Sequence, residues 1–414
     1  MTSSGIHLNS NVAARMSSDT IREMVSWCNR TSADVDTMCK KFKDDIAVEC
    51  SFELTGRNGF DIIFTSGAAE SNSHIITSAV QSYTNKTRGI PHIIISAVES
   101  ESIQLCAAQL RRERRCQLTV IPVCDDGAIS PTTLHESVRT NTCLISICAA
   151  NGETGIINNI RTLSQSPRLS HIPFHTDASQ MFGRSAVRPA ALGVDAFTAE
   201  FQHIGGPPGV GILVVRSSVV EGYNLSPIIS GVGDSLRGGA LNIPALGAAA
   251  YAFRVAMIDR SRKITHTTKL RNGLWNILGK HVTCFMVREL GTPAIPSIDG
   301  GITEMKNSTP ATDDVQRAID SNSPALFWVA PTNTSCVLPN TMLLGMAVNA
   351  KNIVDSLAHE NIYISKIGGR IINAANIHPL LNRGLILISL SDDTTVQDIK
   401  IFAKRFLKLV AGEA

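Results

Sequence analysis

The chain has 414 residues, of which 43% are hydrophobic and 18% charged, and its formal net charge at pH 7 is +3. This composition excludes an extended disordered chain, and the small net charge argues against a nucleic-acid-binding protein. The one dense basic run, residues 111–115, contains a glutamate and no aromatic residue, which is typical of a solvated helix face. Because the length exceeds what one hydrophobic core usually supports, we expect two domains.

No apolar run approaches the roughly 18 to 20 residues that a membrane-spanning helix needs. The N-terminus also lacks the charged and apolar regions of a secretion signal. The ten cysteines contain no CxxC pair, and several lie inside apolar runs. We therefore expect a soluble cytoplasmic protein with reduced, buried thiols and no membrane partner.

Short runs rich in β-branched residues alternate with polar stretches of helical character through the first half of the chain. This alternation predicts a parallel sheet covered by helices on both faces. The predicted strands are residues 60–64, 92–95, 118–123, 143–147 and 211–215.

The pattern changes after about Tyr251. A helical stretch at 258–280 leads to a Pro/Gly/Ser-rich segment at 290–308, and then to short apolar runs at 342–346, 362–364 and 385–390. The chain ends in a predicted helix, with Thr394 and Gln397 spaced as a capping box. We interpret this part as a smaller α+β domain.

Polar segments follow several of the predicted strands. In open α/β sheets, ligands bind beyond the carboxyl ends of the strands, where loops present polar groups. The segments that form a candidate site for this reason are 65–72, 99–102, 151–155, 175–180 and 200–203.

These segments resemble, in order and separation, the motifs of NifS-like cysteine desulfurases and selenocysteine lyases. Residues 64–72 look like F-T-S-G-A-T-E-S-N, 150–155 like A-N-N-E-T-G, and 175–180 like H-T-D-A-A-Q. Downstream, 237–244 resemble R-G-G-T-x-N-x-P and 338–341 read L-P-N-T. The matches cover nearly the whole chain, so we identify it as resembling this family of class V aminotransferases, which are pyridoxal phosphate (PLP) enzymes of fold type I.

The resemblance implies an α/β fold with a mostly parallel seven-stranded sheet, helices on both of its faces, and a smaller α+β domain. It places the large domain at 19–257 and the small domain at 1–18 plus 258–414. It also implies a homodimer with PLP near the interface.

The lysine that holds PLP as a Schiff base matches His203, and an imidazole cannot form that stable bond. No lysine occurs between Lys86 and Lys263. The family's ring-stacking histidine matches Ser100, and the asparagine beside the ring hydroxyl matches Gly152. The resemblance therefore implies a site that has lost its covalent anchor and two supports.

Phosphate-binding hydroxyls of the family match Ala69, Ala240 and Glu200. An acid at the last position opposes a phosphate, since like charges about 4 Å apart repel by roughly 4 kcal/mol at an effective dielectric of 20. Asp177 matches the acid that pairs with the pyridinium nitrogen. The residues assigned to a vestigial PLP pocket are Asp177, Gln180, His175, Ala68, Ala69, Gln202 and Glu200.

The family's nucleophilic cysteine belongs on a loop that matches residues 366–373, where no cysteine occurs, and the chain has none after Cys336. The arginine that clamps the substrate carboxylate matches Leu387. Lys366 reaches the site only if the small-domain loop folds over it.

Three hypotheses follow. The first is a catalytically inactive homologue that acts as a binding or regulatory scaffold for an unknown protein partner. The second is a lyase or transferase that holds PLP without a covalent link and uses His203 as a base. The third is a remodelled pocket with a metal site formed by His175, Asp177, Glu200 and His203, which are all nitrogen or oxygen ligand types.

Overall fold

The computed structural model describes residues 5–50, 59–124, 126–185, 189–223, 225–234, 236–287, 325–329, 336–346, 348–367 and 384–412. The Pro/Gly/Ser-rich segment 290–308 and the loop residues 368–373 lie outside these described residues.

The first sheet has seven strands in the order β2-β8-β7-β6-β5-β3-β4. β8 runs opposite to the other six strands, which are parallel to one another, so the predicted mostly parallel sheet is confirmed. The strands are β2 (Phe60–Thr65), β3 (His92–Ser96), β4 (Gln117–Ile121), β5 (Thr142–Ser146), β6 (Phe174–Asp177), β7 (Ala196–Glu200) and β8 (Gly211–Arg216).

Both faces of this sheet are buried, because successive side chains of a strand point to opposite faces. In β2, Ile62 and Phe64 pack into one hydrophobic core, and Ile63 packs into another. Helices cover both faces. The α-helices of the described residues are α1 (Ser18–Ser26), α2 (Ser32–Cys50), α3 (Ala68–Thr87), α4 (Glu101–Arg112), α5 (Pro131–Ser137), α6 (Ile160–Ser164), α7 (Pro189–Leu192), α8 (Ser217–Tyr223), α9 (Ile243–Leu278), α11 (Ala350–His359) and α13 (Val396–Val410).

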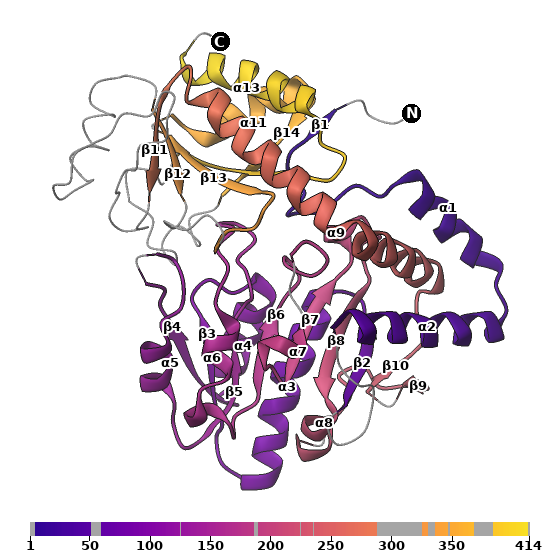
Figure 1. The fold of residues 1–414 in the computed structure, drawn as a ribbon. Helices are drawn as coiled ribbons and strands as arrows, with labels where there is room; N and C mark the ends of the chain where they lie inside the picture. The colour runs from indigo at the N-terminus through magenta and orange to yellow at the C-terminus, as the bar shows by residue number, and fades with distance from the viewer. Residues whose placement is uncertain are drawn as a thin grey trace.

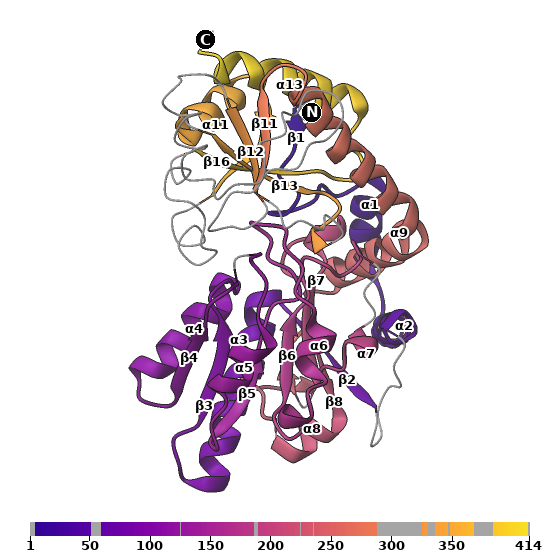
Figure 2. The ribbon, with the colours of Figure 1, turned by 60° about the vertical axis from the view of Figure 1, so that its left-hand side comes forward.

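A second sheet of five strands has the order β11-β12-β13-β16-β15 and lies above the first sheet in Figures 1 and 2. Helices α11 and α13 pack on it and share its hydrophobic core. The remaining strands are β1 (Ile6–His7), β9 (Gly233–Asp234), β10 (Arg237–Gly238), β11 (Thr283–Val287), β12 (Ala325–Val329), β13 (Thr341–Met346), β14 (Ile362–Tyr363), β15 (Ser365–Lys366) and β16 (Leu385–Ser389).

Helix α9 connects the two parts. Its first half contributes Leu246 and Phe253 to the core of the first sheet, and its second half contributes Leu270 and Trp275 to the core of the second. The sequence predicted only the half from residue 258, although Asn242 caps the helix by accepting a hydrogen bond from the amide of Ala245 at 3.3 Å. The boundary at 257/258 falls inside this helix and stays a prediction.

The capping box of the last helix lies one residue further along than predicted. Thr395, not Thr394, accepts from the backbone of Asp398, and the Asp398 side chain accepts from the backbone of Thr395. Gln397 takes no part in this pair of bonds. Both predicted and observed pairs have the same spacing, so the pattern fixed the helix start only to within one residue.

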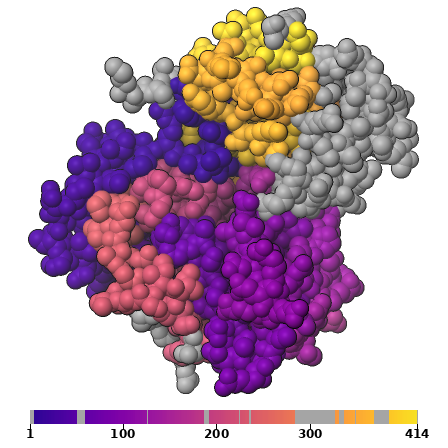
Figure 3. All heavy atoms as spheres, turned by 180° about the vertical axis from the view of Figure 1, so that it is seen from behind, coloured from indigo at the N-terminus to yellow at the C-terminus, as the bar shows by residue number. Residues whose placement is uncertain are grey.

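The N-terminal segment joins the two parts of the molecule. Strand β1 pairs with β14, and the amide of Ser10 donates to the carbonyl of Ser389. Figure 3 shows the indigo N-terminal residues against both the orange C-terminal part and the magenta part. Asn11 lies at the centre of this junction: its Nδ2 donates to the Gly152 carbonyl and to Thr341 Oγ1, both at 2.8 Å.

Replacing Asn11 by alanine is expected to lower the free energy of unfolding by about 2–4 kcal/mol, because it leaves buried partners of its amide without hydrogen bonds. Urea denaturation measures the loss. Val12→Ala is the matched control, since Val12 is 59% exposed and next in sequence. Equal stability of the two variants would contradict a joining role for Asn11.

Candidate functional site

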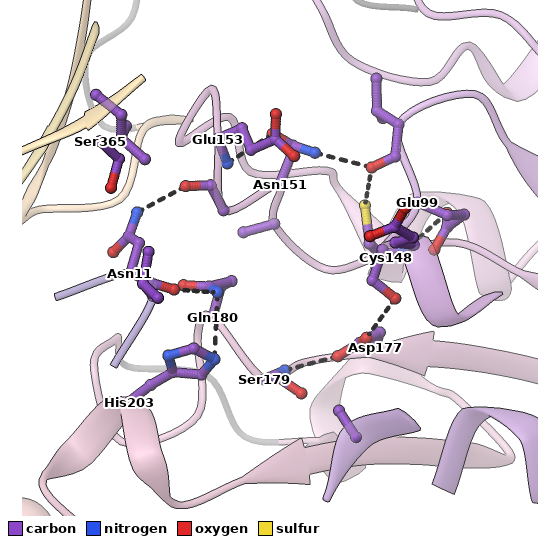
Figure 4. A pocket seen from close by; sticks show the side chains of 18 of the residues that line it. Asn11, Glu99, Cys148, Asn151, Glu153, Asp177, Ser179, Gln180, His203 and Ser365 are labelled. Carbon is purple, nitrogen blue, oxygen red and sulfur yellow. Dashed lines mark hydrogen bonds between the residues drawn. The ribbon is translucent and has the colours of Figure 1, made fainter. Parts of the chain in front are cut away.

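A cavity of about 420 Å³ lies beyond the carboxyl ends of the strands of the first sheet, where the sequence predicted a site. Figure 4 shows labelled side chains from both parts of the molecule around it. Its lining residues are Asn11, Val12, Ala68, Val98, Glu99, Ser100, Glu101, Cys148, Ala150, Asn151, Gly152, Glu153, Asp177, Ser179, Gln180, Glu200, His203, Ser365, Lys366, Ile367 and Leu387.

Asp177 ends β6 and is held by an internal hydrogen-bond network. Its Oδ2 accepts from Asn72 Nδ2 at 2.9 Å and from Ser100 Oγ at 3.1 Å, and its Oδ1 accepts from the amide of Ser179 at 3.0 Å. The carboxylate therefore has a fixed position. Both of its oxygens already have donors within the chain.

Glu99 lies beyond β3, and its side chain is almost fully buried. Its Oε1 accepts from the Ser96 hydroxyl and from the amide of Cys148, the latter at 2.8 Å. Its Oε2 has no hydrogen-bond partner among the described residues. Burial raises the pKa of the Glu99 carboxyl to about 8, although these hydrogen bonds oppose the shift. Glu99 is therefore largely neutral at pH 7.

Glu200 ends β7 and lies against the start of α3. Its Oε2 accepts from the amide of Ala68 at 3.1 Å, and its Oε1 lies 2.8 Å from His203 Nε2. Gln202 Nε2 donates to Oε1 at 2.6 Å. Burial alone would raise the pKa of Glu200, but the hydrogen bonds from His203, Ala68 and Gln202 outweigh it and hold the pKa below its usual value. Glu200 is therefore ionised.

His203 follows β7 in the short 3-10 helix Gln202–Ile204. Its 2.8 Å contact with the Glu200 carboxylate requires a proton on Nε2. The side-chain Nε2 of Gln180 lies 3.3 Å from His203 Nε2. Because both nitrogens then carry protons, Gln180 does not donate a hydrogen bond to His203. Gln180 donates instead to the Asn11 carbonyl at 3.1 Å.

Gly152 leaves room for the Gln180 side chain. A Cβ atom at position 152 would lie 2.8 Å from Gln180 Nε2 and 2.9 Å from its Cδ. Any larger residue here would require Gln180 to move. The observed position of the Gln180 side chain in this cavity therefore depends on glycine at position 152.

The hypothesis of a metal site gains no support from the described residues. The described residues contain no group of three or more His, Cys, Asp or Glu side chains arranged to hold a metal ion, and all four proposed ligands are among them. His175 is fully buried, and its Nδ1 and Nε2 already contact Ser146 Oγ at 2.9 Å and Thr198 Oγ1 at 3.1 Å. Burial lowers the pKa of His175 to about 3, so it is neutral. Glu200 and His203 pair with each other, and Asp177 is held by its own donors.

The second sheet contributes two of the residues singled out in the sequence. Lys366 is exposed and lines the cavity, so the small-domain segment does reach the site. Leu387 pairs with Ser365 across β15 and β16 and presents an apolar wall where the resemblance implies an arginine.

Besides the largely neutral Glu99, the cavity lining carries four carboxyl groups, on Glu101, Glu153, Asp177 and Glu200, against the basic side chains of His203 and Lys366. Anionic ligands therefore meet an acidic surface. The predicted residues Ala69, Gln202, His175 and Ala240 are not among the lining residues, whereas Asp177, Gln180, Ala68, Glu200, His203, Ser100 and Gly152 are.

Sequence reasoning did not single out Asn11, Glu99, Cys148 or Ser179, which also line the cavity. Glu99 and Ser179 lie within polar segments that follow predicted strands, and this signal was available. Asn11 arrives from the N-terminus by tertiary packing, which no local pattern indicates.

A family model described as aminotransferase class-V matches residues 25–235. A NifS-like protein of African swine fever virus (isolate Tick/Malawi/Lil 20-1/1983) is 35% identical over 199 residues, which are 47% of this chain and 50% of that protein. The match thus spans about half the length of this viral relative. A cysteine desulfurase IscS from Buchnera aphidicola subsp. Schizaphis graminum is 31% identical over 325 residues, 78% of this chain and 76% of that protein.

Solved structures show the same fold. The X-ray structure of a NifS-like protein from Rickettsia africae superposes with a TM-score of 0.76 at 22% identity, covering 99% of each chain. The apo structure of a cysteine desulfurase from Thermococcus onnurineus NA1 gives a TM-score of 0.74 at 14% identity, covering 99% of this chain and 95% of that chain.

Proposed function

Because the chain belongs to the aminotransferase class-V family and is a NifS-like relative of the cysteine desulfurases, we propose that it is a catalytically inactive member that serves as a binding or regulatory scaffold. The observation that carries this proposal is the Glu200–His203 pair. It puts an ionised carboxylate on the first amide of α3 and an imidazole at the position that the resemblance assigns to the Schiff-base lysine.

The residues present do not fit PLP, the cofactor that the family implies. An imidazole bonded to Glu200 cannot form the covalent link. The start of α3, a favourable position for a phosphate, already holds a carboxylate. A phosphate here would also meet the acidic lining of the cavity.

The substrate side of the cavity supports the same proposal. Leu387 has no charge with which to bind the carboxylate of an amino acid, and it is buried in the wall. The Ser100 hydroxyl donates to Asp177 in place of a ring that would stack on a cofactor. Neither group supplies the contacts that the family reaction requires.

The scaffold proposal includes a homodimer and an intracellular location. Related desulfurases are typically dimers, and Cys50, Cys143 and Cys148 are buried free thiols, as expected inside a reducing cell. No helix among the described residues is long and apolar enough to cross a membrane. The partner that the scaffold binds is a protein of unknown identity.

A second function is favoured by one observation, the fixed position of Asp177 in the cavity wall. Donors from Asn72, Ser100 and Ser179 orient its carboxylate, as a group that pairs with a pyridinium nitrogen would need. In this alternative PLP is held without a covalent link, and His203 acts as the base of a lyase or transferase.

Purified protein mixed with excess PLP and then desalted is expected to retain no absorbance between about 300 and 450 nm. Borohydride reduction of the same sample is expected to leave the intact mass unchanged, and incubation with cysteine is expected to release no sulfide. A cysteine desulfurase of the family, treated identically, is the positive control.

The contrary outcomes separate the alternatives. Retained PLP without a mass increase favours the non-covalent cofactor. A mass increase on reduction means that a lysine reacts, and Lys366→Ala then tests the one lysine among the cavity-lining residues. Sulfide release by the wild-type chain would contradict the scaffold proposal outright.

A further inference from the structure

The N-terminus of α3 has no cap from its own side chains. Its N-cap residue is Gly67, with φ at 140°, and no side-chain hydrogen bond caps the helix locally. Helix N-termini carry unpaired amides and a partial positive charge, which favour an anion. Glu70 in the first turn accepts from the Ser66 amide at 2.8 Å, whereas the Ala68 amide donates at 3.1 Å to Oε2 of Glu200, which comes from another part of the fold.

The Glu200 carboxylate is held by donors on both of its oxygens. His203 Nε2 lies 2.8 Å from Oε1, and Gln202 Nε2 donates to the same oxygen at 2.6 Å. Gly67 has φ at +140°, which favours glycine, and a Cβ there would lie in ordinary van der Waals contact with Oε2, at 3.4 Å. Three donors therefore converge on one side chain, as they would on a bound oxyanion.

We propose that Glu200 is a built-in anion that fills a binding site for small oxyanions formed by Ala68 N, His203 and Gln202. In wild type the Glu200 carboxylate occupies all three donors, so no ligand is needed. Once this carboxylate is removed, the same donors can bind an oxyanion from solution. This inference deepens the proposed function, because it names the group that occupies the position an anionic ligand would take.

The same geometry predicts the consequence of removing Glu200. An alanine at this position leaves Ala68 N and the His203 and Gln202 side chains without their acceptor. His203 is buried and the other two donors are partly buried, so their loss of an acceptor destabilises the fold. An inorganic oxyanion can restore the lost acceptor. The stability of the variant is thereby linked to the concentration of that anion.

The test compares the melting temperature of wild type and Glu200→Ala in potassium chloride and in potassium phosphate of equal ionic strength. In chloride the variant is expected to melt about 2–5 °C below wild type. Phosphate at about 50 mM is expected to recover at least half of that loss. Wild type and the control Glu101→Ala, an exposed acid in the first turn of α4, are expected to shift by less than about 1 °C between the salts.

A variant that melts lower but responds equally to both salts would overturn the proposal. If Glu200→Ala does not fold, Glu200→Gln decides, because it keeps the volume and removes only the charge. A Glu200→Gln protein that melts within about 1 °C of wild type would show that no anion is needed at this helix start. These readouts are independent of PLP retention and sulfide release, so failure here and failure of the scaffold proposal are distinguishable.

Discussion

Replacing Glu99 by glutamine is expected to make the stability difference from wild type depend on pH. Between pH 5 and pH 8, the free energy of unfolding of the variant minus that of wild type should rise by about 3 kcal/mol. The carboxyl of Glu99 is almost fully buried, and burial raises its pKa to about 8. In the unfolded chain the same group loses its proton near the usual glutamate pKa of about 4.3. Between these two values the folded state binds more protons than the unfolded state.

The sign follows from this difference in bound protons. Stability falls with rising pH wherever the folded state holds the extra proton, so Glu99 destabilises wild type progressively from about pH 4.5 to pH 8. Below this window both states are protonated, and the group has no effect. Glutamine does not titrate, and its Oε1 can still accept from Ser96 and from the amide of Cys148.

Glutamine also lowers the free energy of unfolding by an amount that does not depend on pH. Its Nε2 would take the place of Glu99 Oε2, which has no partner among the described residues, and a buried unpaired donor costs about 1–3 kcal/mol. We therefore expect the variant to be less stable than wild type at pH 5 and to match or exceed it at pH 8.

Denaturant unfolding of both proteins at pH 5, 6, 7 and 8 measures the change. Ionisable groups that both proteins share contribute equally to the two stabilities and cancel in the difference. Glu101→Gln is the control, because this neighbouring acid is exposed; its difference from wild type should vary by less than about 0.5 kcal/mol. A difference for Glu99→Gln that stays constant with pH would mean that Glu99 is ionised in the folded protein.

Five strands of the first sheet were predicted, all but β6 and β7, because burial on both faces leaves continuous β-branched runs. Ile93, Ile94 and Ile95 illustrate this, since all three are buried in β3 although they point to alternate faces. The first half of α9 was not recognised. Residues such as Ala248, Ala249 and Ala250 are all buried there, so this stretch lacks the one-sided apolar pattern by which a surface helix is recognised.

The position of the candidate site was predictable from the polar segments after the strands, but its internal bonding was not. The sequence indicated an acid at Glu200 opposed to a phosphate. It did not indicate that the carboxylate would bond to the Ala68 amide and to His203, because these contacts depend on how β7 and α3 pack. The metal hypothesis has the same weakness, since residue type and spacing cannot show that His175 contacts Ser146 and Thr198.

The double variant Glu200→Ser with His203→Lys is expected to gain PLP binding that survives desalting and borohydride reduction. The serine removes the carboxylate from the α3 amide and supplies a hydroxyl, and the lysine places an amine on the cavity wall. Removing one like charge at about 4 Å is worth up to roughly 4 kcal/mol at an effective dielectric of 20. The three donors around Glu200 already shield that charge, so we expect a gain in affinity of about 10- to 1,000-fold.

The single variants separate the two contributions. Glu200→Ser is expected to improve PLP affinity without a mass increase after reduction, because it still lacks the amine. His203→Lys is expected to gain little, because the new ammonium group would pair with the neighbouring Glu200 carboxylate and the acid would still oppose the phosphate. Titration by absorbance gives the affinities, and intact mass after reduction gives the covalent fraction. If His203→Lys alone retains as much reduced PLP as the double variant, Glu200 does not control access of the phosphate, and the loss of the lysine by itself explains the difference from the desulfurases.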